Sequence, residues 1–159
     1  MNHTTVAALR VLLVILFLSA VSAQAWFIPI TAYKNARDFP ELAQLAVGYG
    51  ILWGAVTLCV QIALVALWVL LGKVRRGAIF SDRSFVWVNA IIGAGLLATA
   101  LVAGFEFHLL GVVDVGGPPL GILLTIIVAA GAAFTLVMVV MRGLLRQATE
   151  LQTELEEVV

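Results

Sequence analysis

Residues 42–72 read LAQLAVGYGILWGAVTLCVQIALVALWVLLG, a stretch without a single charged side chain. The hydrocarbon core of a bilayer is about 30 Å thick, and about 20 apolar residues in a helix cross it. A helix also satisfies its backbone hydrogen bonds internally, as any lipid-exposed segment must. Three more stretches are equally free of charge and long enough to span a bilayer, namely residues 11–33, 84–105 and 115–141.

These four stretches predict an all-α integral membrane protein folded as a four-helix bundle. The composition agrees, because 63% of the residues are hydrophobic and 11% are charged, whereas soluble domains carry about 25% charged residues. We expect a single domain with four spans, at about residues 9–31, 43–72, 84–106 and 118–142. Residues 143–159 would form a C-terminal helix that extends into the cytoplasm as an amphipathic segment.

The first stretch has a second interpretation, as a secretory signal peptide. Arg10 would be its basic flank, and Ala23-Gln24-Ala25 would be a cleavage site of the A-x-A type. Apolar character nevertheless continues past this motif from Trp26 onward. We therefore expect an uncleaved first span, with removal of a signal peptide as the alternative.

Basic residues in the connections predict the orientation, because cytoplasmic loops carry an excess of lysine and arginine. The connection between the second and third spans contains Lys73, Arg75, Arg76 and Arg83, whereas the next connection contains no basic residue. We therefore expect this basic connection and both termini to lie in the cytoplasm. Arg75 and Arg76 are in addition interfacial candidates for contact with anionic lipid headgroups.

Small and aromatic residues indicate how the second span packs and where it meets the interface. A stripe of small residues spaced by four lies at Ala46, Gly50 and Gly54. Such a stripe lets helices approach closely, and we expect packing within one bundle, with dimerisation as the alternative. Trp26, Tyr33 and Tyr49 are expected to anchor the outer membrane interface, where aromatic side chains are enriched.

Few polar side chains lie inside the spans, and Gln61 is the deepest amide among them. One interpretation is a ligand-contacting or pore-lining residue, with Thr57 and Asn89 as further lining candidates. The other is an interhelical hydrogen bond, worth about 0.6 kcal/mol on average in a measured membrane protein. No acid or base lies in the middle of a span, whereas proton-coupled transporters and ion pumps usually carry one. The interhelical hydrogen bond is therefore the favoured interpretation.

Glu106, His108 and Asp114 lie at the outer end of the third span. Two carboxylates and an imidazole could bind a divalent metal or sense protons, because histidine titrates near physiological pH. Glu106 and His108 are only two positions apart, however, so on one helix they point to different faces. We therefore expect a solvated interfacial loop, with the metal or proton-sensing site as the alternative.

Motifs of other function classes are missing from the sequence. It contains no phosphate-binding loop, no H-E-x-x-H zinc motif and no nucleophile–base constellation. The net charge is zero, which provides no electrostatic basis for binding nucleic acid. We therefore expect no catalytic residue, cofactor or metal, and no direct contact with nucleic acid.

An apolar seam with heptad spacing follows the fourth span, at Leu144, Ala148, Leu151, Leu155 and Val158. All charged residues beyond Arg146 are glutamates, so anionic lipid headgroups repel this segment and it should project from the membrane. Two heptads alone form a marginal coiled coil, because short isolated helices are unstable in water. The seam therefore predicts binding to a second copy of the chain or to a cytoplasmic protein.

Two segments resemble a known family of small bacterial membrane proteins. RGAIFS at residues 76–81 resembles its R-G-x-x-F-S signature, and MRGLLRQATEL at residues 141–151, followed by ELEEV at residues 154–158, resembles its C-terminal segment. The family is catalogued as domain of unknown function 2975, and its four-span members are thought to be encoded beside small helix-turn-helix regulators. The resemblance implies the same architecture in the bacterial inner membrane and supplies no catalytic residue.

The function we expect is that of a non-enzymatic, multi-pass protein of the bacterial cytoplasmic (inner) membrane, acting as a sensor or scaffold. Its C-terminal helix would engage a second copy or a cytoplasmic partner such as a helix-turn-helix regulator. Two other classes stay open. One is a small oligomeric channel or transporter lined by Gln61, Thr57 and Asn89, and the other is an accessory subunit of a larger membrane complex.

Overall fold

The computed structural model describes residues 3–38, 40, 43–75, 82–114 and 116–157 of the chain. Every element in these ranges is helical, and the described residues contain no strand. In chain order the elements are α1 (His3–Ser22), the π-helix η1 (Ala23–Phe27), α2 (Ile28–Asp38), α3 (Ala43–Arg75), α4 (Asp82–Glu106), the π-helix η3 (Phe107–Val112) and α5 (Gly117–Glu157). The prediction of an all-α fold is therefore confirmed.

Within the described ranges, four helical segments are long and apolar enough to cross a membrane, namely Thr5–Asp38, Ala43–Lys73, Phe85–Val112 and Gly117–Glu150. Each is longer than the roughly 20 residues that a spanning helix needs. The mean hydropathy of the chain is +1.13. The chain is thus a multi-pass transmembrane protein, as the sequence predicts.

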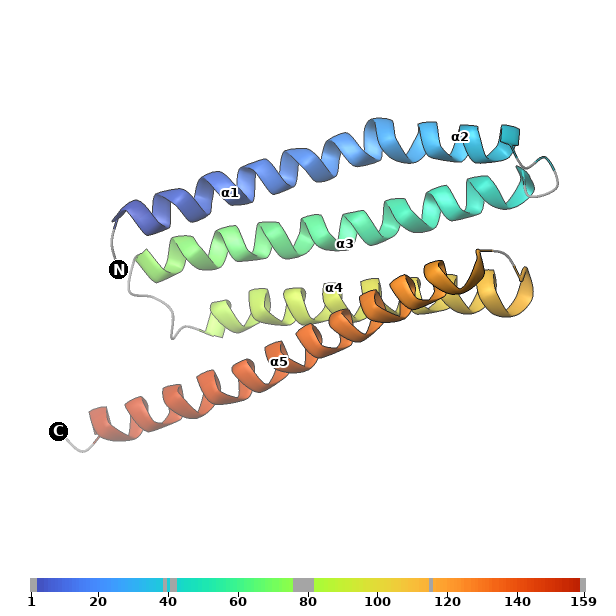
Figure 1. Cartoon of the computed structure of the whole chain (residues 1–159). Helices are drawn as coiled ribbons and strands as arrows, with labels where there is room; N and C mark the ends of the chain where they lie inside the picture. The colour runs from blue at the N-terminus through green and yellow to red at the C-terminus, as the bar shows by residue number, and fades with distance from the viewer. Residues whose placement is uncertain (1–2, 39, 41–42, 76–81, 115, 158–159) are drawn as a thin grey trace.

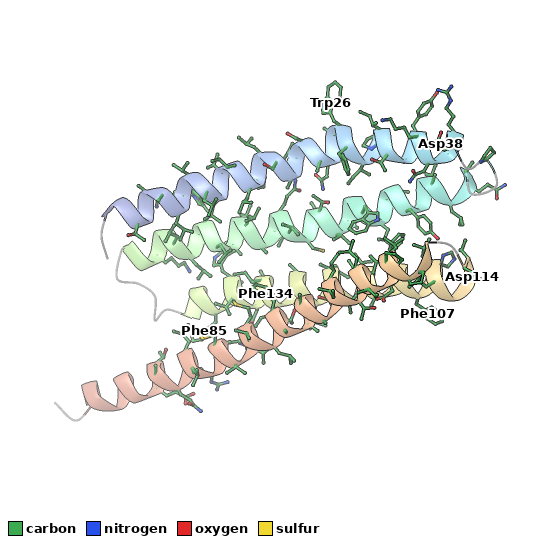
Figure 2. The ribbon with its side chains drawn as sticks, viewed as in Figure 1. Trp26, Asp38, Phe85, Phe107, Asp114 and Phe134 are labelled. Carbon is green, nitrogen blue, oxygen red and sulfur yellow. The ribbon has the colours of Figure 1, made fainter. Side chains whose placement is uncertain are left out.

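Successive spans run in opposite directions along the bundle (Figure 1). α3 packs against α1, α2 and α4, and α5 packs against α4. One end of the bundle carries the start of α1 and the last turns of α5, and is called the termini end below (Figure 1). The other end carries Asp38 and Asp114, and is called the Asp114 end (Figure 2).

The bundle is held by apolar contacts at both ends. At the termini end, buried side chains of α1 and α3 meet in a cluster of Val6, Leu13, Leu64 and Leu71. At the Asp114 end, α4, η3 and α5 meet in a second cluster of Val102, Phe105, Leu109 and Leu124. Large apolar side chains such as Ile51 and Val140 point outward and are 69% and 61% exposed. Lipid covers such a surface without cost, so the small buried core is the one expected of a membrane bundle.

Two glycine–threonine contacts bring α4 and α5 close together. A Cβ atom added at Gly95 would lie 2.9 Å from Thr135 Oγ1, and one added at Gly131 would overlap Thr99 Oγ1. Each threonine is held by its own helix, because Thr99 Oγ1 donates to the Gly95 carbonyl at 2.8 Å and Thr135 Oγ1 donates to the Gly131 carbonyl at 2.9 Å. Only glycine fits at these two crossings without a shift of the neighbouring threonine.

The first span changes from α to π geometry at η1, where the Ile28 N–H bonds to the Ala23 carbonyl. The cause lies in Pro29, which has no N–H and whose ring would clash with the Ala25 carbonyl in a regular α-helix. A wider turn relieves this clash, and such π-bulges bend helices. The axis changes direction between α1 and α2, and Trp26 points away from the bundle (Figures 1 and 2).

The third span also ends in π geometry, because the Val113 N–H bonds to the His108 carbonyl at 3.0 Å. A tight turn follows, in which Asp114, Gly116 and Gly117 have φ values of 55°, 118° and 63°. Aspartate and glycine tolerate this left-handed region better than other residues. Pro118 then stands in the first turn of α5, where its missing N–H removes no helical hydrogen bond.

Candidate functional site

Two glutamine side chains tie the first span to α3 inside the membrane. Gln61 is 8% exposed, and its Nε2 donates to Gln24 Oε1 at 3.0 Å. Gln24 Nε2 in turn donates to the Gly54 carbonyl at 3.1 Å. Gln61 therefore makes the interhelical hydrogen bond that is one of the two roles its sequence position predicts. Its partner Gln24 belongs to η1; the sequence marks Gln24 as part of a possible cleavage site and gives no sign that it pairs with Gln61.

The three candidate lining residues of a channel have three different surroundings. Gln61 faces Gln24, as described above. Thr57 is half-buried, and its hydroxyl donates to the Trp53 carbonyl of its own helix at 2.8 Å. Asn89 is exposed on the outer surface of α4. The structure thus brings no two of them into a mutual hydrogen bond among the described residues.

His108 pairs with Tyr49 across the Asp114 end of the bundle. Tyr49 Oη and His108 Nδ1 are 2.8 Å apart, and the two ring centroids are 5.9 Å apart. With the imidazole proton on Nε2, the tyrosine hydroxyl donates and Nδ1 accepts. Tyr49 is therefore half-buried against η3, and its role as an interfacial anchor stays a prediction. Tyr33 is 72% exposed, and its role as an interfacial anchor likewise stays a prediction.

Three aromatic rings stack edge to face beside this pair. The Tyr49 and Phe105 centroids are 4.9 Å apart with an interplanar angle of 86°. The Trp53 and Phe105 centroids are 5.6 Å apart at 71°. Such pairs contribute about 0.5–1.5 kcal/mol each beyond the burial of their area. The cluster therefore fixes α3 against α4 near the Asp114 end.

The acidic residues near His108 have separate surroundings. The Glu106 carboxylate is hydrogen-bonded to the Thr125 hydroxyl of α5, whereas His108 turns toward α3. Asp114 is exposed in the turn before α5. Among the described residues, no three histidine, cysteine, aspartate or glutamate side chains are grouped closely enough to hold a metal. Glu106 and His108 thus face different helices, as their spacing predicts.

A cavity of about 520 Å³ lies between the first span, α3 and the end of α4 that belongs to the Asp114 end. Its α3 wall consists of Ala46, Tyr49, Gly50, Trp53 and Thr57. Its wall on the first span consists of Ala23, Phe27, Ile28, Thr31, Ala32 and Asn35. Phe105, Leu109 and Leu120 complete the lining. Both π-helices and the start of α5 therefore contribute to one mostly apolar cavity.

The small-residue stripe of α3 borders this cavity. A Cβ atom added at Gly50 would make only ordinary contacts, 3.7 Å from Ala32 Cβ and 3.8 Å from Ile28 Cγ2. One added at Gly54 would meet no atom within 4 Å. The stripe therefore faces the first span within the bundle at Gly50, with ordinary contacts, and leaves space beside α3 at Gly54.

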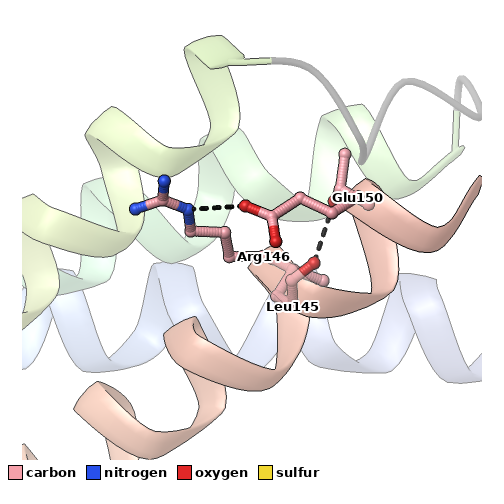
Figure 3. A network of polar contacts seen from close by, with 4 residues as sticks. Leu145, Arg146 and Glu150 are labelled. Atoms are coloured by element: carbon pink, nitrogen blue, oxygen red, sulfur yellow. Dashed lines mark hydrogen bonds and ion pairs between the residues drawn. The ribbon is translucent and has the colours of Figure 1, made fainter. Parts of the chain in front are cut away.

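At the termini end, α5 continues without a break as far as Glu157. Its seam residues Leu144 and Ala148 are exposed, Leu144 by 56%. Arg146 Nε and Glu150 Oε1 form an exposed ion pair at 3.0 Å, beside a hydrogen bond from Thr149 to the Leu145 carbonyl (Figure 3). An exposed pair of this kind contributes at most about 0.5 kcal/mol to the helix.

For the remaining predicted site residues, either the side chain or the whole residue lies outside the described part of the chain. The backbone of Leu151 and Leu155 is helical, but their side chains and the whole of Val158 are not described. The same holds for the Arg75 side chain and for the whole of Arg76. The seam beyond Ala148 and the basic connection therefore stay sequence predictions.

Comparison with known proteins gives a family and no individual relative. A family model described as "Protein of unknown function (DUF2975)" matches residues 30–159, which is most of the chain. No curated protein and no solved structure matches the chain. The match agrees with the resemblance of the R-G-x-x-F-S segment and the C-terminal segment.

Proposed function

This chain belongs to the family described as "Protein of unknown function (DUF2975)". From the length and surface of its last helix, α5, we propose that it is a non-enzymatic sensor or scaffold of the bacterial inner membrane. Both termini would lie in the cytoplasm, where the C-terminal part of α5 engages a second copy of the chain or a cytoplasmic protein. A small helix-turn-helix regulator is a suitable partner, and the chain itself would not bind nucleic acid.

The length of α5 is the observation that carries this proposal. The helix has 41 residues and, at about 1.5 Å per residue, spans about 60 Å. A bilayer core is only about 30 Å thick, so roughly half of the helix has no place in lipid. Figure 1 shows its C-terminal part diverging from the other helices toward the termini end. A rigid arm of this kind is suited to presenting a binding surface beside the membrane.

The surface of this arm supports binding rather than packing within the bundle. Leu144 and Ala148 are exposed, and the sequence continues their heptad seam through Leu151 and Leu155. Arg146 and Glu150 pair on a different part of the helix surface. An apolar seam beside charged positions is the pattern of a helix that pairs with another helix.

Contact of α5 with the rest of the bundle supports a sensing role. Leu120 in its first turns lines the cavity, and Gly131 and Thr135 pack tightly on α4. A change in the cavity would therefore act on the same helix that carries the exposed seam. Coupling of this kind needs two arrangements of α5, which a ligand would populate differently.

The seam can be tested with full-length protein in nanodiscs by substituting Leu151→Asp and Leu155→Asp together. A control with Thr149→Asp and Thr153→Asp adds the same charge away from the seam. Two readouts are self-association in analytical ultracentrifugation and binding to a co-expressed cytoplasmic regulator. We expect the seam variant, like a truncation after Arg146, to lose self-association or regulator binding, and the control to retain the activity of the wild type in the same readout. Equal association or binding by the seam variant and the wild type would contradict the proposal.

A further inference from the structure

The cavity beside α3 is large for a tightly packed bundle and has the size of a ligand site. Ligand pockets typically measure about 300–1,000 Å³, and this one measures about 520 Å³. It adjoins η1 and η3, and π-bulges are frequent at functional sites. Ala46 and Gly50 keep the space open, so the sequence of α3 preserves a hollow that larger residues would fill.

The charge of the lining restricts what could occupy this space. None of the described residues that line the cavity is acidic or basic. Moving an ionised group into an apolar site without an opposite charge is costly. The occupant must therefore be neutral, which excludes free fatty-acid anions and charged lipid headgroups from the interior of the cavity.

The hydrogen-bonding groups of the lining restrict the occupant further. The Thr31 hydroxyl donates to the Phe27 carbonyl at 2.7 Å, the Thr57 hydroxyl donates to the Trp53 carbonyl, and the Tyr49 hydroxyl is bonded to His108. The Trp53 indole N–H and the Asn35 amide, by contrast, have no hydrogen-bond partner among the described residues. Within the described part of the chain, these two groups are therefore available to donate to an acceptor on a ligand.

We propose that the cavity binds a neutral amphiphile of the membrane, with an apolar body among the aromatic and aliphatic side chains and a carbonyl oxygen that accepts from the Asn35 amide. The carbonyl lies toward the Asp114 end, where Asn35 is exposed, and the apolar body extends past Gly50 toward Ala23 and Thr57, deeper in the bundle. This ligand would be the signal that α5 transmits through Leu120, and in that respect the inference rests on the proposed function.

Binding can be measured through Trp53 in full-length protein that carries Trp26→Phe, Trp68→Phe and Trp87→Phe. A dibrominated stearoyl monoglyceride, which is neutral and has an ester carbonyl, is added at low mole fraction to phosphatidylcholine vesicles containing this protein. We expect saturable quenching of Trp53 fluorescence. Two control compounds should quench only in proportion to their concentration in the bilayer. They are dibrominated stearate at alkaline pH and the dibrominated hydrocarbon of the same length.

Two substitutions at neighbouring positions separate the cavity from the lipid-facing surface. Ala46→Phe fills the cavity, whereas Val47→Phe adds the same ring at a position that is 67% exposed. We expect Ala46→Phe to weaken the saturable quenching at least tenfold and Val47→Phe to leave it unchanged, at equal thermal unfolding temperatures. Asn35→Leu changes an exposed side chain, so it provides a second test of the cavity site if Ala46→Phe does not fold. We expect it to remove the preference for the monoglyceride over the hydrocarbon.

Several outcomes would overturn the cavity assignment. Equal saturable quenching by stearate and monoglyceride would contradict a neutral site, and unchanged quenching in both Ala46→Phe and Asn35→Leu would mean that Trp53 senses only surrounding lipid. The seam experiment measures association of Leu151→Asp and Leu155→Asp protein without added ligand. Failure of the cavity assignment and failure of the proposed function are therefore observed separately.

Discussion

Single residues account for the polar contacts inside the bundle, and the sequence predicts only some of them. The hydrogen-bonding role of Gln61 follows from its depth, because an unpaired amide in lipid is unfavourable. Its partner Gln24 does not follow, because spans that are apolar all round do not reveal which faces meet. The proximity of Tyr49 and His108 is easier to predict, because each residue lies near the end of a span and the two ends lie on the same side of the membrane.

The Gln24–Gln61 hydrogen bond can be measured by a double-mutant cycle with Gln24→Leu and Gln61→Leu. We expect each single substitution to destabilise the protein, and the coupling free energy to be about 0.6 kcal/mol and at most about 1.7 kcal/mol. Unfolding of the wild type, the two single variants and the double variant in mixed micelles gives the four free energies of unfolding that are needed. Additive effects of the two substitutions would contradict the bond, and ion flux through wild-type protein in liposomes that Gln61→Leu abolishes would favour the channel alternative.

At the scale of the elements, hydropathy predicts the helices well, and the irregular turns are harder to predict. Four helical segments cover nearly all of the charge-free stretches, because a span needs only length and apolar character. The π turn at η1 has a recognisable cause in Pro29. The cavity has no such signal, because the stripe of Ala46, Gly50 and Gly54 is also the pattern of close helix packing. The true close contacts are at Gly95 and Gly131, where a threonine on the facing helix meets each glycine.

Gly131→Ala and Gly143→Ala test the contact between α4 and α5 as a matched pair on one helix. A Cβ atom at residue 131 would overlap Thr99 Oγ1, which is held by the Gly95 carbonyl, whereas one at residue 143 meets no atom within 4 Å. We expect Gly131→Ala to destabilise the bundle by about 1–3 kcal/mol through overpacking. Gly143→Ala should be neutral or slightly stabilising, because alanine favours helix.

Thermal unfolding of the two alanine variants in the same detergent checks this difference. In the Gly131→Ala background, Thr99→Ala should recover part of the lost stability, because it removes the hydroxyl that the new Cβ atom overlaps. Thr99→Ser should not recover stability, because serine keeps the hydroxyl. Equal unfolding temperatures for Gly131→Ala and Gly143→Ala would show that α4 and α5 do not meet as the structure has them.

At the scale of the whole molecule, the two ends of the bundle differ in character. The Asp114 end contains the cavity, the aromatic cluster and the Tyr49–His108 pair, and the termini end carries the exposed start of the seam. α5 connects them, since Leu120 lines the cavity and Leu144 is exposed at the other end. The sequence predicts this division only in part, because charge and heptad spacing mark the seam but no residue pattern marks the cavity.

The proposed function requires that the far end of α5 lies in the cytoplasm and the Asp114 turn lies outside it. Single cysteines introduced by Thr153→Cys or Asp114→Cys, each in a Cys59→Ser background, can be labelled with a membrane-impermeant maleimide. We expect Asp114→Cys protein to react in intact spheroplasts, and Thr153→Cys protein to react only in inverted membrane vesicles. Reaction of Thr153→Cys protein in intact spheroplasts would place the seam outside the cell and contradict its binding to a cytoplasmic partner.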